Sequence, residues 1–356
     1  MPYLVHLVIL LFIQEWGQSM GNGLLLAALE GKNTSRPPVW LMRQAGRYMP
    51  EYRKLREKHT LWQMFHEPEI AFQVTCQPID ILGVDAAILF SDILVIGEAL
   101  GLNVHFPEGR GPFIDFSGDV KSLDERNPEE ALFYVKKTIE LLKPELKVPL
   151  IGFSGGPFTV ASYMIDKGGK GELKLTRKWL AENPQSFHLL LEKITVATIA
   201  YLKMQIKAGV NAVQVFDSWA GVLSYEEFHE FCLPYLSKIT EALKSTNIPV
   251  ILFCRGSSYF AADLAKAYPA CISLDAHKPL AELRKIIPSS IAVQGNLDPY
   301  LLYSSKDKIK EKTRELLRSM QGDPGFIVNL AHGVFPDISV DHVKCLVDTV
   351  KEFNAR

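Results

Sequence analysis

The chain has 356 residues, of which 47% are hydrophobic and 22% charged, and this balance provides enough apolar material for one large globular core. Its 39 lysine and arginine residues nearly match its 40 aspartate and glutamate residues, so the net charge of -1 gives no overall attraction to nucleic acid or anionic lipid. Five scattered cysteines without a CxxC pair exclude a disulfide framework and are typical of a reducing cytoplasm.

The chain begins with an almost wholly apolar stretch at residues 4–13. This stretch is too short to cross a bilayer, which takes about 20 apolar residues. It also lacks the basic residues and the small-residue cleavage site of a secretory signal. We interpret residues 1–20 as an extension outside the folded domain, with translation starting at Met20; a membrane-associating or packing segment is the alternative. The folded domain is predicted to span residues 21–356.

After Met20, short apolar runs alternate with longer segments of helical periodicity. Strands are predicted at 39–41, 86–90, 150–153, 212–216, 250–254, 271–274, 291–294 and 326–330. Helices are predicted at 68–82, 128–142, 184–208, 224–243, 257–268, 279–287, 306–320 and 340–353. The segment 101–127 is rich in Gly, Pro and Asp and is predicted to be a long loop. Eight such units predict an α/β fold, a single, somewhat distorted (β/α)8 TIM barrel, with a doubly wound open sheet as the alternative.

In a barrel of this kind the active site lies at the carboxyl ends of the strands. The residues directly after the predicted strands are unusually polar here, although turns are polar in most proteins. They are Arg43, Ser91, Asp92, Ser154, Asp217, Ser218, Arg255, Asp275, His277, Asn296, Asp298 and His332.

Four arginines, Arg43, Arg47, Arg53 and Arg56, stand between the first predicted strand and the next helix. Guanidinium groups bind carboxylates or phosphates through two parallel hydrogen bonds and stay charged at all working pH values. The cluster therefore predicts a clamp for a polyanionic ligand. Ion pairing at the surface is the alternative, and it suits Arg53 better than the two arginines nearest the strand end.

Three further features point to the same end of the barrel. Asp92 is a lone carboxylate between two apolar runs, and a buried carboxylate needs hydrogen-bond donors, an arginine partner or a ligand. The segment GFSGGPFTV at 152–160 lacks the pattern of a P-loop or of a dinucleotide fingerprint, and predicts close approach of the backbone to a large ligand, with Tyr163 just beyond it. His332 follows the last strand, where a histidine serves either in packing or on the catalytic rim.

Several of these segments together resemble the uroporphyrinogen decarboxylase family. They are PVWLMRQAGRYMPEYR (38–53), LFSDILV (89–95), GFSGGPFTVASYM (152–164), VFDSWAG (215–221), QGNLDP (294–299) and NLAHGVFP (329–336). The resemblance runs from about Leu24 to the C-terminus. It implies a distorted barrel, commonly a homodimer, that converts uroporphyrinogen III to coproporphyrinogen III in heme biosynthesis without a metal or an organic cofactor.

The resemblance also implies which residues form the site. Catalysis would fall to Asp92, Arg43 and Arg47. The substrate would be bound by these three residues together with Arg56, Tyr163, Ser218 and His332. The chain departs from the family at Ala331, where a glycine commonly precedes the histidine, and at Trp219, where some members carry histidine, so no role is transferred to Trp219.

The chemistry of that substrate fits these residues. Uroporphyrinogen carries carboxylates around its rim, which suit the arginines, and pyrrole N–H groups at its centre, which suit an ionised Asp92 because this group only accepts hydrogen bonds. Direct loss of carbon dioxide would leave an unstabilised carbanion. We therefore expect the adjacent pyrrole to be protonated at carbon first, with Asp92 favouring the resulting cation. Arg43 is expected near the proton transfer, but its high pKa makes it a poor acid, so the acid stays open.

Two other classes of function stay open on the sequence alone. A corrinoid or thiol methyltransferase of similar fold would need zinc held by histidine and cysteine, but Leu252 stands where a His-x-Cys pair with Cys254 would place its histidine. A tetrapyrrole carrier without catalytic activity would use the arginines but has less need of Asp92. Stoichiometric zinc would favour the first class, and binding without turnover the second.

Overall fold

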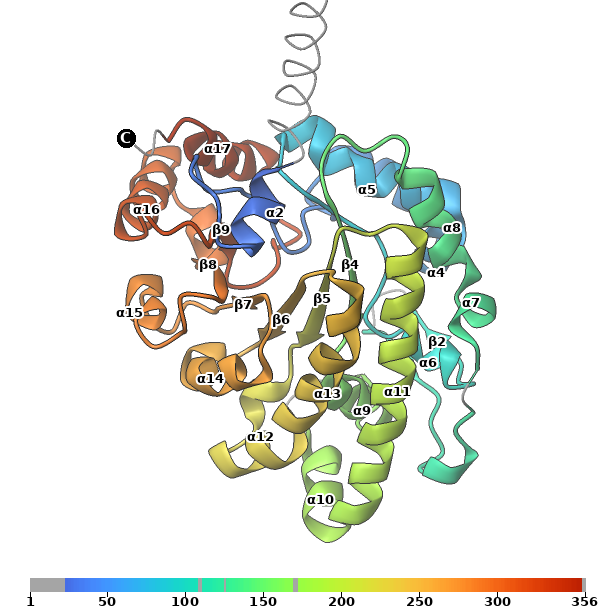
Figure 1. The fold of residues 1–356 in the computed structure, drawn as a ribbon. Coiled ribbons are helices and arrows are strands. Elements are labelled where there is room, and N and C mark those ends of the chain that lie inside the picture. Colours follow the sequence, from blue (N-terminus) through green and yellow to red (C-terminus); the bar gives the residue numbers. More distant parts are fainter. Residues whose placement is uncertain (1–22, 108–110, 125, 169–171, 354–356) are drawn as a thin grey trace, which may run out of the picture.

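A parallel sheet curled into a barrel forms the centre of the molecule, and helices surround it (Figure 1). The computed structural model describes residues 23–107, 111–124, 126–168 and 172–353, so the predicted N-terminal extension lies outside the described residues. Neighbouring strands of this sheet are parallel. In spatial order they are β1 (Ala87–Ile88), β4 (Leu150–Gly155), β5 (Ala212–Asp217), β6 (Val250–Cys254), β7 (Cys271–Ser273), β8 (Ala292–Leu297) and β9 (Phe326–Leu330).

The residues predicted as the first strand, 39–41, close the barrel without forming a regular strand. Val39 makes an isolated parallel bridge to Val328 of β9. The N–H of Val328 donates to the carbonyl of Pro38 at 2.9 Å, and the N–H of Asp85 donates to the carbonyl of Val39 at 2.8 Å. This segment therefore lies between the two edges of the sheet. Pro38 has no N–H to extend a ladder, which limits the strand to a bridge. The predicted barrel fold is confirmed with this change.

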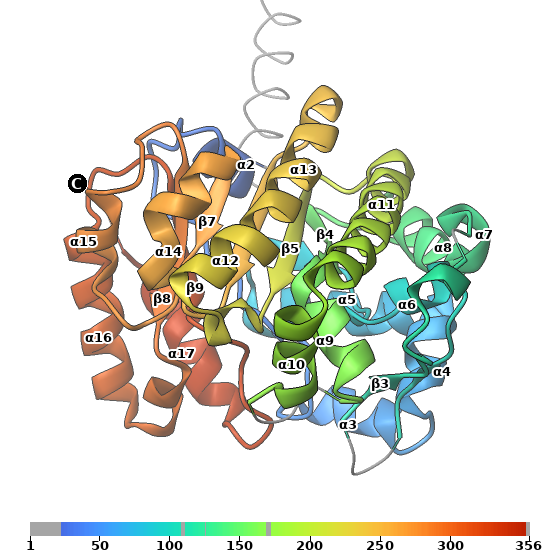
Figure 2. The ribbon, with the colours of Figure 1, turned by 90° about the horizontal axis from the view of Figure 1, so that it is seen from below.

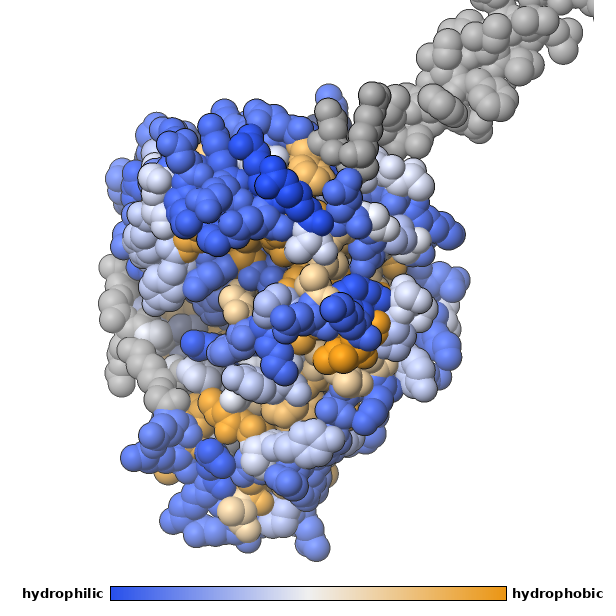
Figure 3. All heavy atoms as spheres, turned by 90° about the vertical axis from the view of Figure 1, so that its left-hand side faces the viewer, coloured by the Kyte–Doolittle hydropathy of each residue, from blue (hydrophilic) through white to orange (hydrophobic). Residues whose placement is uncertain are grey.

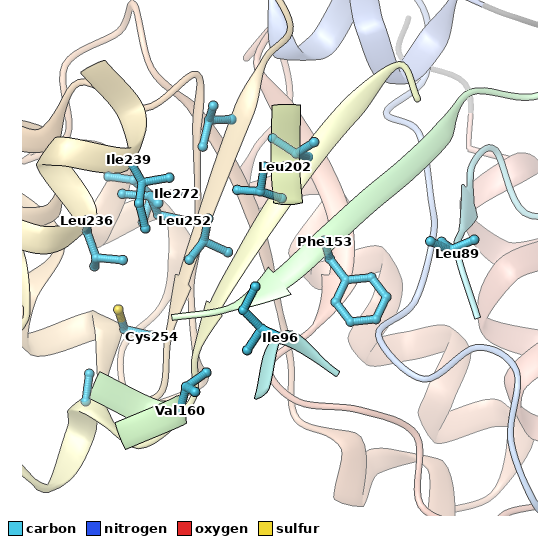
Figure 4. Packing of buried hydrophobic residues seen from close by; sticks show 14 of the residues in the cluster. Leu89, Ile96, Phe153, Val160, Leu202, Leu236, Ile239, Leu252, Cys254 and Ile272 are labelled. Atoms are coloured by element: carbon cyan, nitrogen blue, oxygen red, sulfur yellow. The ribbon is translucent and has the colours of Figure 1, made fainter. Parts of the chain in front are cut away.

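Two apolar cores stabilise the barrel, because alternate residues of each strand point to opposite faces of the sheet. The inner core fills the barrel, and helix α2 (Leu24–Leu29) packs against it at the amino ends of the strands. It includes Leu25, Leu29, Trp40, Ala86, Ile151, Ala212, Ile251 and Ile327. The outer core lies between the strands and the helices. Figure 4 shows part of it, where Leu252 and Ile272 of the sheet lie in the same cluster as Leu236 and Ile239 of α13 (Leu233–Leu243).

Most of the predicted helices are present, but several are shorter than predicted or divided. The undivided helices that keep their predicted start are α5 (Pro68–Leu82), α11 (Pro184–Ala208), α16 (Lys306–Ser319) and α17 (Val340–Lys351), of which the first two match in full. The predicted helix 279–287 is shortened to α15 (Leu280–Arg284).

The divided helices were each predicted as one. They are α7 (Pro128–Ala131) with α8 (Phe133–Leu142), α12 (Tyr225–Phe231) with α13, and α14 (Ser257–Leu264) with the 3-10 turn η4 (Ala265–Ala267). Pro234 lies in the first turn of α13, where its missing N–H and its ring interrupt a continuous helix and explain the break at Cys232.

Short elements that the sequence did not predict lie mainly on the side of the barrel seen in Figure 2. They are α3 (Pro50–Arg56), α4 (Leu61–His66), α6 (Ile96–Ala99), α9 (Pro157–Ile165) and α10 (Lys174–Glu182). The predicted loop 101–127 also contains a short antiparallel pair, β2 (Val104–His105) with β3 (Phe113–Ile114). These insertions follow strand ends and surround the entrance to the barrel.

The outer surface is polar where helices cover the last strands. Figure 3 views the side that carries α14, α15 and α16, where hydrophilic side chains predominate and apolar ones form small separate areas. None of the helices in the described ranges has both the length and the apolar composition needed to span a membrane.

Candidate active site

A cavity opens at the carboxyl ends of the strands, at the end of the barrel where the sequence predicts the active site. It encloses about 220 Å³. Its walls come from the loop after residue 41, the end of β1, the strands β4, β5 and β6, and the loop after β9. Four of the predicted site residues, Arg43, Asp92, Ser218 and His332, share its lining.

Three phenylalanines form an apolar wall of this cavity. Phe153 of β4, Phe216 of β5 and Phe253 of β6 line it, and their rings meet edge to face with centroids 5.6 Å and 5.8 Å apart. Figure 4 shows Phe153 extending from the carboxyl half of its strand. Such a surface suits the face of a large ring system. The sequence analysis missed these residues, although each one stands just before the polar end of its strand.

Asp92 lies half-buried beside that wall. Its Oδ1 accepts a hydrogen bond from the N–H of Leu94 at 2.9 Å. No arginine of the described ranges is in ion-pair contact with Asp92, although the charge of Arg43 is close enough to favour its ionised form. Burial outweighs both effects and raises the pKa of Asp92 to about 6. Within the described ranges the carboxylate therefore has a backbone donor but no ion-pair partner, and it remains available to a ligand.

Arg43 reaches the cavity from a backbone that is held in an uncommon conformation. Its φ of 57° lies in the left-handed region, which costs a residue other than glycine about 1–2 kcal/mol. The flanking Met42 fixes the loop by donating its N–H to Oδ1 of Asn329 at 3.0 Å and accepting from the N–H of Val334 at 3.0 Å. Gly333 makes room for the arginine, because a Cβ there would lie 2.4 Å from Cδ of Arg43. Strain of this kind is concentrated at functional sites.

His332 is uncharged at neutral pH. Its burial and the neighbouring charges of Arg43 and Arg255 lower the pKa of the imidazole to about 4. A neutral imidazole donates one hydrogen bond and accepts another, so His332 can orient a polar ligand in either way.

Tyr163 lies on α9 and is not among the residues that line the cavity. Burial raises its pKa, and the charges of Asp92 and Arg43 act on it in opposite directions. Its ring approaches that of Trp219, with centroids 6.4 Å apart. Tyr163 therefore lies within electrostatic reach of two residues that line the cavity, Asp92 and Arg43.

Arg47 and Arg56 lie farther out. Neither lines the cavity, and both act on the buried hydroxyl of Tyr52 through their charge. Arg56 donates to the carbonyl of His59 at 2.6 Å. Arg53 donates from Nη1 to the carbonyls of Arg47 and Tyr48, at 2.9 Å each, so it holds the turn before α3.

Glycines of the segment 152–160 lie close to other parts of the protein, while Phe153 of the same segment lines the cavity. A Cβ on Gly152 would lie 2.3 Å from Oε1 of Gln205, and one on Gly156 would lie 2.5 Å from the side chain of Asp217. These glycines therefore allow the strand β4 and its following turn to pack tightly against the next elements.

Asp217, which packs against Gly156, holds the loop that carries Ser218 in place. Its Oδ1 accepts from the N–H of Thr159 at 2.8 Å and from the hydroxyl of Thr159 at 2.6 Å. The same hydroxyl accepts from the N–H of Trp219 at 2.9 Å. Asp217 is fully buried, so we assign it to positioning Ser218 and Trp219 and not to contact with a ligand.

The buried charge of Asp92 is expected to cost stability. Its folded pKa of about 6 lies above the unfolded value, so folded protein binds the proton more tightly and the free energy of unfolding rises as pH falls through 6 toward 4. Asp92→Asn removes this dependence. We expect the variant to be more stable than the wild type at pH 7.5, by at most about 3 kcal/mol, and equal to it at pH 4. Urea unfolding at both pH values measures the difference, and a less stable variant at pH 7.5 would contradict the expectation.

Within the described ranges, no group of three or more histidine, cysteine, aspartate or glutamate side chains is arranged to hold a metal ion. Cys254, the cysteine that the methyltransferase alternative would use, is fully buried.

The family model described as uroporphyrinogen decarboxylase (URO-D) matches residues 20–353. The chain is 52% identical over 335 residues to the uroporphyrinogen decarboxylase of Protochlamydia amoebophila (strain UWE25), covering 93% of this chain and 92% of that protein. It is 44% identical over 329 residues to the uroporphyrinogen decarboxylase of Magnetococcus marinus, covering 89% and 92%. A solved methyltransferase from Methanosarcina mazei superimposes with a TM-score of 0.78 over 92% of this chain and 97% of that chain, but at 22% identity this likeness concerns the fold alone.

Proposed function

The chain belongs to the uroporphyrinogen decarboxylase family, and we propose that it removes carbon dioxide from the four acetate side chains of uroporphyrinogen III to give coproporphyrinogen III. One observation of the active site supports this proposal most strongly. Asp92 is a carboxylate without an ion-pair partner in the described ranges, it lies beside an aromatic wall, and it shares its cavity with Arg43. This combination suits a ring that has N–H groups at its centre and carboxylates at its rim.

In the proposed complex, the macrocycle packs against the wall formed by Phe153, Phe216 and Phe253. Its pyrrole N–H groups donate to Asp92. Arg43 binds a carboxylate close to the reacting position, while Arg47 and Arg56 bind carboxylates farther out. Tyr163, Ser218 and the neutral His332 orient the polar groups of the substrate.

The proposed chemistry uses the substrate as its own electron sink. A proton adds to the ring carbon next to the one that bears the acetate arm, and the pyrrole becomes a cation with positive charge on the acetate-bearing carbon. The bond to the carboxylate then breaks, carbon dioxide leaves, and the electron pair of that bond neutralises the ring. A proton adds to the exposed carbon to form the methyl group, and the ring loses the proton that it gained. Asp92 lowers the energy of the cationic state because a fixed negative charge is worth most where water is excluded.

Taken together, these steps consume one proton for each carbon dioxide released and need no other reactant, so we propose that no metal or organic cofactor takes part. The test is incubation with freshly reduced uroporphyrinogen in the presence of a chelator, followed by chromatography of the oxidised products. We expect four successive losses of carbon dioxide, ending at coproporphyrin. Absence of turnover that zinc restores would contradict the proposal, and binding without turnover would favour a carrier.

Arg47 provides a second test of the proposed contacts. Arg47→Lys keeps the charge but loses the planar fork that binds a carboxylate through two hydrogen bonds. We expect the KM for uroporphyrinogen to rise about 10-fold with kcat nearly unchanged, because the lost contact is present in both the ground state and the transition state. Steady-state kinetics measure both constants. An unchanged KM would exclude Arg47 from the substrate rim.

We further propose that the protein acts as a homodimer in the cytoplasm, as the family resemblance implies. All five cysteines are unpaired, which supports a reducing compartment. Light scattering from the purified protein tests the dimer, since a mass of two chains is expected and a mass of one chain would contradict it.

A further inference from the structure

A second cavity, of about 280 Å³, adjoins the first at the carboxyl ends of β5 and β6. Ser218 lines both cavities. We call the second one the side cavity, and its lining is Ser218, Trp219, Gly221, Val222, Arg255, Gly256, Tyr259 and His277. Because one residue belongs to both walls, a ligand that overfills the first cavity reaches the side cavity directly.

A tetrapyrrole does overfill the first cavity. Pockets that hold drug-sized ligands commonly enclose about 300–1,000 Å³. The first cavity encloses about 220 Å³, which is too small for a macrocycle with eight acidic side chains. The side chains on one edge of the ring must therefore extend past Ser218 or into solvent.

Arg255 lines the side cavity, and its charge has no ion-pair partner among the described residues. Its side chain is exposed, and within the described ranges it makes no hydrogen bond or ion pair. Other arginines of the chain are engaged in such contacts, as Arg177 is with Glu227 and Arg284 with Asp323. The charge of Arg255 is also felt in the first cavity, since together with Arg43 it lowers the pKa of His332.

The backbone around Arg255 is tightly packed, so the point from which its side chain extends is defined. The segment after β5 packs directly on it, and a Cβ on Gly221 would lie 2.5 Å from the carbonyl oxygen of Arg255. Gly256 follows with a φ of 78°, a left-handed conformation that suits glycine and turns the chain away from β6.

The acid that contacts His277 of the side cavity already has hydrogen-bond partners of its own. Asp275 is buried, accepts hydrogen bonds from the hydroxyl of Ser258 and from the N–H of His277, and lies 3.0 Å from Nδ1 of His277. Tyr259, 64% exposed, adds a hydroxyl at the same wall. The free charge of the side cavity is thus positive, and hydrogen-bonding groups surround it.

We propose that Arg255 binds a side-chain carboxylate of the tetrapyrrole in the side cavity while the reacting acetate lies near Arg43 and Asp92. This rests on the proposed function. A carboxylate held there, on the far side of Ser218, fixes how the ring is rotated against the phenylalanine wall, and so determines which acetate is presented for reaction. Both acetate and propionate arms carry the required group.

The test compares Arg255→Gln and Arg255→Lys with a control, Arg314→Gln, which removes an exposed arginine from α16 on the outside of the barrel. We expect Arg255→Gln to raise the KM for uroporphyrinogen about 10-fold or more, with kcat changed less than about threefold, since charged hydrogen bonds are among the strongest. Arg255→Lys should show a smaller rise, and Arg314→Gln none. Thermal unfolding checks that each variant is folded.

The partly decarboxylated intermediates identify which arm is bound. A rise in KM that persists when the pentacarboxylate porphyrinogen is the substrate assigns Arg255 to a propionate. A rise that is lost with this substrate assigns it to an acetate. An unchanged KM for every substrate, or a loss confined to kcat, overturns the proposal. Either result would leave the proposed function intact as long as the wild type turns over uroporphyrinogen, whereas an inactive wild type would contradict that function itself.

Discussion

Replacing Asp92 by asparagine is expected to lower kcat for uroporphyrinogen by about 10²–10³-fold, the loss found when a preorganised electrostatic contact to a transition state is removed. The substitution preserves the volume of the side chain and its ability to accept the N–H of Leu94. What it removes is the negative charge that favours the cationic ring. Because the folded protein carries that charge at a cost, the loss of activity should come with equal or greater stability.

The matched control is Asp298→Asn, which changes an exposed carboxylate that caps η5 (Pro299–Tyr303) beyond the end of β8. Its kcat should stay within about twofold of the wild type, since such surface changes rarely matter to a buried site. Steady-state kinetics on both variants, with urea unfolding of each, separate the two roles. Near-normal turnover by Asp92→Asn would reject the electrostatic role of this residue.

Arg43→Gln is expected to lower kcat/KM by about 10²-fold, because it removes the one arginine among the residues that line the first cavity. The charge of Arg43 also lowers the pKa of Asp92 and of His332. Without it, both pKa values should rise, and the activity should begin to fall at a higher pH than in the wild type when the solution is acidified.

Arg43→Lys distinguishes charge from geometry at the same position. Lysine keeps the positive charge, so the pH at which activity falls should stay near that of the wild type, while kcat/KM still drops because the bidentate fork is lost. Rate measurements from pH 5 to 8 on both variants give the two quantities. If Arg43→Gln leaves the pH profile unchanged, Arg43 is not in electrostatic contact with Asp92.

The parts of the fold that the sequence predicted are those that depend on local pattern. Continuous apolar runs identified the strands, and proline with helical periodicity gave α5 and α11 their full ranges. The first strand and the helix around Cys232 differ from prediction because prolines interrupt their hydrogen bonding, an effect that depends on the neighbouring segments. Likewise, the breaks between short helices are set by packing against the barrel rather than by propensity.

In the candidate site, too, the sequence predicted what depends on local pattern and missed what depends on contacts between distant segments. That Asp92, Arg43, Ser218 and His332 line one cavity follows from their places at strand ends. The left-handed conformation of Arg43 and its contact with Gly333 join segments almost three hundred residues apart, and no local pattern indicates them. For Arg53 the sequence left surface ion pairing open as an alternative to the clamp, and within the described ranges this arginine instead donates to backbone carbonyls.

Glycine-rich segments show most clearly that the same sequence pattern can have two different physical causes. The segment 152–160 is glycine-rich for close packing against Gln205 and Asp217, whereas a ligand-binding loop would be glycine-rich for approach to a substrate. The sequence pattern is the same in both cases. Only the positions of the neighbouring side chains distinguish them.

The most direct test of the account is the ratio of kcat/KM for the wild type to that for Asp92→Asn, measured from pH 5 to 8 at uroporphyrinogen concentrations well below KM. Titration of the substrate cancels in this ratio. The pKa of Asp92, raised to about 6 by burial, predicts a large and constant ratio above pH 7 that falls toward one as the pH drops below 6, while His332, with a pKa near 4, does not titrate in this range. A ratio near one throughout, or a large ratio that does not change with pH, would contradict the claim that the charge of Asp92 drives the reaction.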